Sequence, residues 1–102
     1  MFDKLLQAQQ KADEIKKRLD HISVSAEVED GKIRISATAN KHITSVSIDT
    51  GFLRSADQEE LEELLAAAIN KALVQAENVS QAEMQAATRD MMGGLGNLFG
   101  NK

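Results

Sequence analysis

The chain has 102 residues, which is the length of one domain, and 42% of them are apolar. Fourteen of the apolar residues are alanines and only three residues are aromatic, so we expect a homodimer with a shared core rather than a well-packed monomer. The net charge of −4 argues against a histone-like cationic coat, and the lack of cysteine excludes disulfides, thiolate zinc sites and cysteine nucleophiles.

Membrane insertion and export are not expected from this sequence. No apolar run approaches the roughly 20 residues that a bilayer-spanning helix needs. The opening Met-Phe-Asp-Lys has neither the basic start nor the apolar stretch of a signal peptide. We therefore expect a cytoplasmic protein with no membrane partner.

Residues 2–20 are predicted to form a helix, because apolar residues recur there at alternating spacings of three and four. The seam consists of Leu5, Ala8, Ala12, Ile15, Leu19 and Ile22. So narrow a seam favours packing against another helix over packing against a broad sheet. Lys16, Lys17 and Arg18 fall in the last turn, where cations meet the negative end of the helix dipole.

Three strands are predicted at residues 22–29, 32–39 and 43–49, where apolar and polar residues alternate. Asp30-Gly31 is typical of a tight hairpin turn, since glycine tolerates positive φ, and Asn40-Lys41 offers the second turn. The result is an antiparallel meander with one apolar face that needs a cover.

A long second helix is predicted over residues 57–92, after a connection at 50–55 with Phe52 and Leu53 tucked beneath it. Asp57 with Glu60 fits a capping box, and Ser55 with Gln58 is the competing register. The expected buried stripe comprises Leu61, Leu65, Ala68, Ala72, Ala76 and Val79. About 35 residues span roughly 50 Å, so the distal half must project, pair with a second copy, or fray.

The fold class is therefore α+β, with an α-β-β-β-α protomer and one domain over residues 1–92. Six of residues 93–102 are glycine or asparagine, and we expect this segment to be a flexible tail. The alternative is that Leu95, Leu98 and Phe99 dock on a partner surface.

Catalytic and metal chemistry find little support in the residues. His21 and His42 are the two histidines, and a metal site would need Glu27, Glu29 or Asp49 to converge on them. No phosphate-binding loop, dinucleotide fingerprint or nucleophile elbow is present. The cluster Glu59, Glu60, Glu62 and Glu63 fits solvated surface at a helix N-terminus. We expect no enzyme, no cofactor, no metal and no small-molecule substrate.

The charge distribution is more informative than the total. Residues 1–18 carry a local excess of two positive charges, whereas residues 57–83 carry seven carboxylates and one lysine. Lys4, Lys11 and Arg18 are seven residues apart and form a line beside the seam, which we call the basic ridge. Two ridges in a dimer could reach phosphates on both sides of a duplex, with Arg34 and Arg89 adding contacts. The alternative is that these are ordinary solubilising charges.

Several segments, in order, resemble the YbaB/EbfC family. Residues 5–11, Leu-Leu-Gln-Ala-Gln-Gln-Lys, resemble its K-Q-A-Q-Q-type opening. Gly31-Lys32-Ile33-Arg34-Ile35 followed by residues 43–49 is similar to its G-x-V-x-V … V-x-I-D stretch. Residues 60–72 resemble its L-E-D-L-x-x-A-A-x-N-x-A segment, and the glycine- and leucine-rich tail fits as well.

The resemblance implies a small nucleoid-associated protein that forms a homodimer with helices projecting like tweezers and binds duplex DNA with little sequence specificity. It implies a nucleoid location and a role in gene regulation and chromosome organisation. From charge geometry, the candidate DNA-contacting residues are Lys4, Lys11, Lys16, Lys17, Arg18, Arg34 and Arg89. A homodimer would carry about −8, so contact with DNA must be local and steeply salt-dependent. The alternative function is a protein–protein adaptor that uses the projecting helices and the apolar tail.

Overall fold

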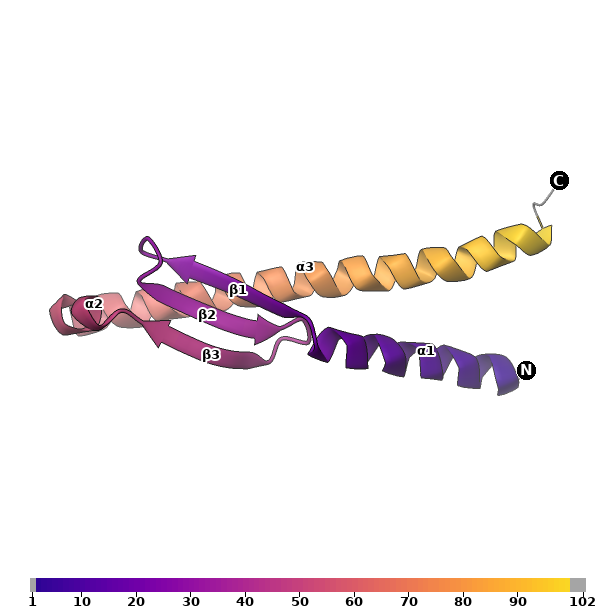
Figure 1. Cartoon of the computed structure of the whole chain (residues 1–102), viewed down its shortest axis with the longest axis horizontal. Helices are drawn as coiled ribbons and strands as arrows, with labels where there is room; N and C mark the ends of the chain where they lie inside the picture. The colour runs from indigo at the N-terminus through magenta and orange to yellow at the C-terminus, as the bar shows by residue number, and fades with distance from the viewer. Residues whose placement is uncertain (1, 100–102) are drawn as a thin grey trace.

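A computed structural model of the chain describes the backbone of residues 2–99 and the side chains of residues 3–90. The elements are α1 (Phe2–Asp20), β1 (Ser23–Val28), β2 (Ile33–Thr38), β3 (Ile43–Ile48), α2 (Thr50–Ser55) and α3 (Gln58–Phe99). The predicted α+β fold, with its antiparallel meander and long C-terminal helix, is confirmed (Figure 1). Helix α2 was not predicted. No helix among the described residues is long and apolar enough to cross a bilayer.

The sheet has the order β1-β2-β3, and α3 packs along its apolar face over β1 and β2. The register places Ala26 opposite Ile35 and Val28 opposite Ile33, so these four side chains share the face beneath the helix. Ile33 and Ile35 are the largest fully buried side chains among the described residues, which makes the core of one copy small. Val46 lies opposite Ile35 on β3, beyond the helix, and is 49% exposed.

The β1–β2 hairpin turns one residue earlier than predicted. Glu29 (φ 53°) and Asp30 (φ 55°) are both left-handed, and the N–H of Gly31 donates to the Val28 carbonyl over 3.2 Å. Glu29 and Asp30 are therefore the central residues of a primed turn, and Gly31 (φ 87°) follows it. The loop of residues 29–32 keeps Val28 opposite Ile33. A slip of one residue in this register would turn the apolar side chains of β2 away from the core.

Residues 50–55, predicted to be a plain connection, form helix α2. The Asp49 carboxylate caps the helix by accepting a hydrogen bond from the N–H of Phe52 over 3.0 Å. Phe52 is buried as predicted, and the Lys32 ammonium lies 5.6 Å from the centroid of its ring. Leu53 is 50% exposed, contrary to the prediction. Successive residues of a helix point about 100° apart, so the core takes Phe52 and leaves Leu53 outside.

Helix α3 follows the Asp57 register, because the Asp57 carbonyl accepts from the N–H of Leu61 over 2.9 Å. Ala68, Ala72 and Ala76 are fully buried, which confirms the centre of the predicted stripe. The helix was predicted to end at Met92 but continues to Phe99. Each glycine weakens a helix by about 1 kcal/mol relative to alanine without blocking it as proline does. Flexibility of residues 93–102 stays a prediction, because their side chains lie outside the described residues.

Helix α1 and the distal half of α3 project from the same end of the sheet as two arms (Figure 1). The α1 seam is buried only at the root of the arms, where Leu19 is 4% exposed, whereas Leu5 farther out is 65% exposed. The chain measures 66 × 28 × 18 Å, and its radius of gyration is 19.6 Å. A compact domain of this length has a radius of gyration of about 13 Å, so one copy leaves much of its apolar surface uncovered.

Candidate nucleic-acid interface

Five of the seven candidate DNA-contacting residues lie on α1. They are Lys4, Lys11, Lys16, Lys17 and Arg18, and all five are exposed. Because α1 is one continuous helix, the three members of the basic ridge drift by only about 20° at each step and span about 21 Å along its axis. Lys16 and Lys17 point to other sides of the helix than Arg18, since consecutive helical residues are about 100° apart.

The inner end of the basic ridge is tied to α3. Arg18 Nη1 lies 3.3 Å from Glu83 Oε1, and the two helices run in opposite directions along the arms (Figure 1). The side of α1 that carries the ridge is therefore the side toward α3. Lys11 Nζ lies 4.0 Å from Glu14 Oε2 on its own helix, and Lys4 has no ion-pair partner among residues 3–90.

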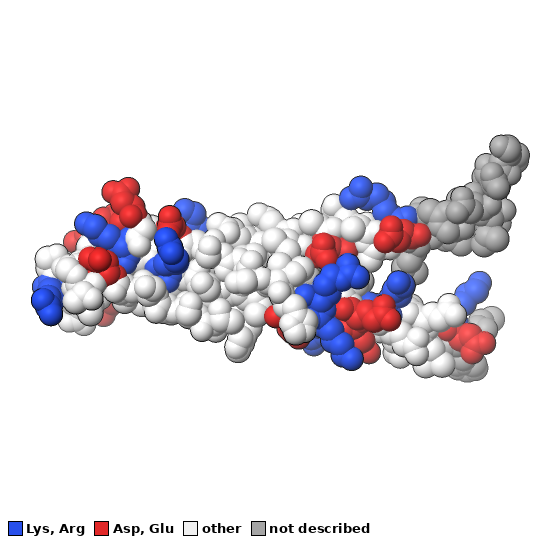
Figure 2. Space-filling view, in the orientation of Figure 1, with Lys and Arg blue, Asp and Glu red and all other residues white. Residues whose placement is uncertain are grey.

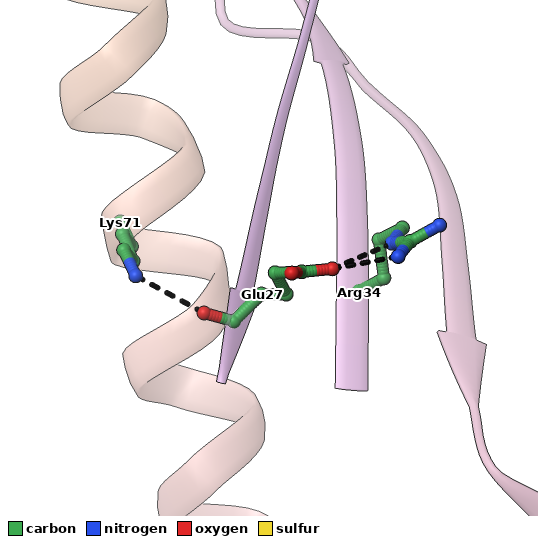
Figure 3. Close-up of polar contacts among 3 residues, drawn as sticks. All are labelled: Glu27, Arg34 and Lys71. Carbon is green, nitrogen blue, oxygen red and sulfur yellow. Dashed lines mark hydrogen bonds and ion pairs between the residues drawn. The ribbon is translucent and has the colours of Figure 1, made fainter. Parts of the chain in front are cut away.

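Arg34 lies apart from these cations, on the face of β2 opposite α3. Its Nε and Nη2 donate to Glu27 Oε2 over 2.9 and 2.7 Å, and Lys71 Nζ donates to the Glu27 backbone carbonyl over 3.1 Å (Figure 3). This cluster lies toward the end of the sheet away from α1 (Figure 1). The structure therefore does not bring Arg34 together with the basic ridge.

Arg89 is exposed on the distal half of α3, on the other arm. With Met84, Gln85 and Thr88 it lines a shallow, open hollow in the surface of that helix. Arg89 thus lies on the arm opposite the basic ridge, and the arrangement offers cations on both arms.

Lys41 is a further cation at the root of the arms that the sequence did not single out. It occupies the β2–β3 turn in a left-handed conformation (φ 68°), and its Nζ lies 2.5 Å from Glu77 Oε2 on α3. The adjacent Asn40 side chain donates to the Lys16 carbonyl over 2.8 Å and to Asp20 Oδ1 over 2.5 Å. This turn is therefore docked on the last turn of α1. Figure 2 shows the resulting mixture of blue and red side chains where the arms meet the body.

The hydrogen bond from Lys41 lowers the pKa of Glu77 below its ordinary value of 4.5, with a further hydrogen bond from Gln81 and the charge of Lys41 acting in the same direction. The folded-state pKa is depressed, so the stability that this carboxylate contributes is present above pH 4.5 and is lost as the pH falls through the lower folded value. We expect carbon-detected NMR to show Glu77 titrating below 4.5 and Lys41→Met to move its pKa upward. Lys11→Met is the control for this change of charge. An unchanged Glu77 pKa in Lys41→Met would contradict the assignment of Lys41 as the cause of the lowered pKa.

The two histidines are exposed, His21 after α1 and His42 in the β2–β3 turn. Among the residues that the structure describes, no group of three or more His, Cys, Asp and Glu side chains is placed to hold a metal ion. What the described surface presents is a set of cations on two arms, interleaved at the root with carboxylates of α3.

Residues 1–91 match the profile of the YbaB/EbfC DNA-binding family. The chain belongs to this family. This is a family of DNA-binding proteins rather than a class of enzymes, and the resemblance seen in the sequence is confirmed. The YbaB/EbfC match covers all the elements from α1 through most of α3.

Curated relatives of this YbaB/EbfC chain carry consistent names. A nucleoid-associated protein of Flavobacterium johnsoniae is 39% identical, over 97% of this chain and 94% of that protein. Nucleoid-associated proteins of Rhodopseudomonas palustris (36% identity, 94% and 87% covered) and Afipia carboxidovorans (33%, 86% and 84%) are also similar. An uncharacterized protein of Helicobacter pylori has the same fold, with a TM-score of 0.63 at 18% identity over 76% of this chain and 92% of that one.

Proposed function

We propose that this YbaB/EbfC member is a nucleoid-associated protein that binds duplex DNA with little sequence specificity and contributes to nucleoid organisation and gene regulation in the cytoplasm. The observation that carries the proposal is the basic ridge of Lys4, Lys11 and Arg18, which lies exposed along one projecting helix of a member of a DNA-binding family. Lys16, Lys17, Arg34 and Arg89 are proposed as secondary contacts.

The mechanism that suits the ridge is contact with the phosphate backbone. Its three cations follow a nearly straight line of about 21 Å, and a phosphate backbone presents regularly spaced negative charges along such a line. Contacts of this kind fix position on the duplex and carry no sequence information directly. Because the net charge of each copy is −4, attraction is confined to the arms and is weakened strongly by salt.

A homodimer that joins the copies through β3 is part of the proposal. On the apolar side of β3, Ile43 and Ile48 are partly buried against the core, but Val46 between them is 49% exposed. β3 is an edge strand of sequence Ile-Thr-Ser-Val-Ser-Ile, and it lacks the charges or proline that usually protect an edge from pairing. A second copy seated there would enlarge the small core and bring two basic ridges to one assembly.

The direct test is fluorescence anisotropy with a random-sequence duplex of about 30 base pairs at roughly 50 to 200 mM salt. We expect micromolar or tighter binding at low salt, a log K that falls linearly with log salt by about 0.9 per neutralised phosphate, and equal affinity for unrelated sequences. Absence of binding even at the lowest salt would refute the proposal and favour the adaptor function. A salt-independent affinity would refute the phosphate mechanism.

A further inference from the structure

Two cations from different parts of the chain converge on α3 at the root of the arms. Arg18 reaches Glu83 from the last turn of α1, and Lys41 reaches Glu77 from the β2–β3 turn. The two carboxylates are six residues apart on α3, which is about 9 Å along the helix axis. Each cation is therefore matched with its own carboxylate across the junction of the arms and the body.

The position of Lys41 is fixed by the backbone rather than by its own side chain. Asn40 holds the turn on the end of α1, and the N–H of Lys41 donates to the Thr38 carbonyl over 2.9 Å. A left-handed backbone is uncommon for a residue other than glycine and is maintained here by the surrounding hydrogen bonds. Lys41 therefore stays beside the inner end of the basic ridge whether or not it is paired with Glu77.

Both ion pairs lie at the surface and are exchangeable. The Lys41 and Glu77 side chains are 51% and 42% exposed, and those of Arg18 and Glu83 are 61% and 29% exposed. Exposed pairs of this kind contribute little to stability and are screened by salt. A phosphate presents the same kind of anionic oxygen acceptor as a carboxylate, so it competes for the same cations. The lowered pKa of Glu77 means that this competitor is ionised at neutral pH.

We propose that Lys41 and Arg18 form a pair of phosphate-binding cations at the root of the arms. When DNA is absent, the carboxylates of Glu77 and Glu83 bind these two cations in place of phosphate. The proposal rests on the proposed DNA-binding function and adds Lys41 to its contacts. Binding a duplex then exchanges two internal ion pairs for two phosphate contacts. Competition from the two α3 carboxylates therefore lowers the affinity for DNA.

The test is the double variant Glu77→Gln/Glu83→Gln, which keeps the shape of both side chains and removes both competing charges. Its matched control is Glu59→Gln/Glu63→Gln, the same charge change on the same helix about 21 Å or more away from Glu77 along the axis. That separation exceeds two Debye lengths at 0.1 M salt, where one Debye length is about 10 Å. Glu59 and Glu63 are exposed and have no ion pair with the residues that the structure describes.

In the anisotropy titration at about 0.1 M salt, we expect the Glu77/Glu83 variant to bind duplex DNA about tenfold more tightly than the unaltered protein, with a salt slope steeper by up to about 1.8 in each copy. The control should stay within about twofold. Adding Lys41→Met to the Glu77/Glu83 variant should cancel much of the gain, because the released ammonium is then missing.

Three results would overturn the inference, and they are separable from failure of the proposed function. Equal tightening in the variant and the control would show an effect of net charge alone. No tightening in the Glu77/Glu83 variant would show that the carboxylates do not compete with phosphate. A gain that survives Lys41→Met would exclude Lys41 as a contact. Absence of DNA binding by the unaltered protein and by every variant would instead refute the proposed function itself, and this inference with it.

Discussion

Reversing the basic ridge with Lys4→Glu, Lys11→Glu and Arg18→Glu is expected to weaken binding to duplex DNA by at least about 100-fold at low salt and to flatten its salt dependence. Each lost phosphate contact reduces the magnitude of the slope of log K against log salt concentration by about 0.9. The loss of three contacts therefore reduces it by about 2.7 in each copy. The new carboxylates also repel the duplex. The loss should be the same for unrelated DNA sequences, because phosphate contacts carry no base information.

The control for this variant changes the charge equally at the other end of the molecule, with Lys32→Glu, Arg54→Glu and Lys71→Glu. These cations lie around α2 and the β1–β2 hairpin, away from the arms. We expect the control to lose far less affinity than the ridge variant, with circular dichroism used to verify that both remain folded. Equal losses would mean that DNA responds to total charge and that the ridge has no special role.

Helix α3 and the three strands could be read from periodicity because each presents a regular apolar face to the same core. Helix α1 could be read from its regular seam, although only the end of that seam at Leu19 is buried. Ala68, Ala72 and Ala76 repeat every four residues and are buried along one side of α3, and Ile33 and Ile35 are alternate residues of β2 that are buried in the core. Helix α2 escaped prediction because six residues are too few to establish a helical period, and its stability comes from the Asp49 cap and the burial of Phe52. The end of α3 was misplaced because glycines weaken a helix without terminating it.

The candidate site could be predicted only where it lies on a single element. Lys4, Lys11 and Arg18 share one helix, so their spacing alone defines their alignment. The pairing of Arg18 with Glu83 spans 65 residues and depends on how the arms pack, which local sequence does not encode. Lys41 is brought to the same place by the hydrogen bonds of Asn40, and an Asn-Lys turn has no sequence signal that distinguishes a docked turn from a solvated one.

Replacing Val46 with aspartate is expected to separate the proposed homodimer of two 11.1 kDa chains into monomers. In a single copy Val46 is half exposed, so the new carboxylate would remain in water and unfolding would be little affected. In the proposed dimer the carboxylate would be buried without a partner, at a cost of about 3 kcal/mol or more, which is roughly a 100-fold loss of dimer affinity. Sedimentation velocity at micromolar concentration measures the change directly.

Ser45→Asp is the matched control, because Ser45 neighbours Val46 on β3 and points to the opposite face of the sheet. It should remain a dimer, and a Val46→Asp variant that also remains a dimer would refute the proposed interface at β3.

DNA binding by the Val46→Asp monomer then shows whether the ridges of two copies must act together on one duplex. Two ridges on one assembly engage a duplex with the avidity of linked sites, so a monomer should bind far more weakly than the dimer even though every cation of its ridge is intact. An unchanged affinity would instead mean that each pair of arms acts on DNA alone.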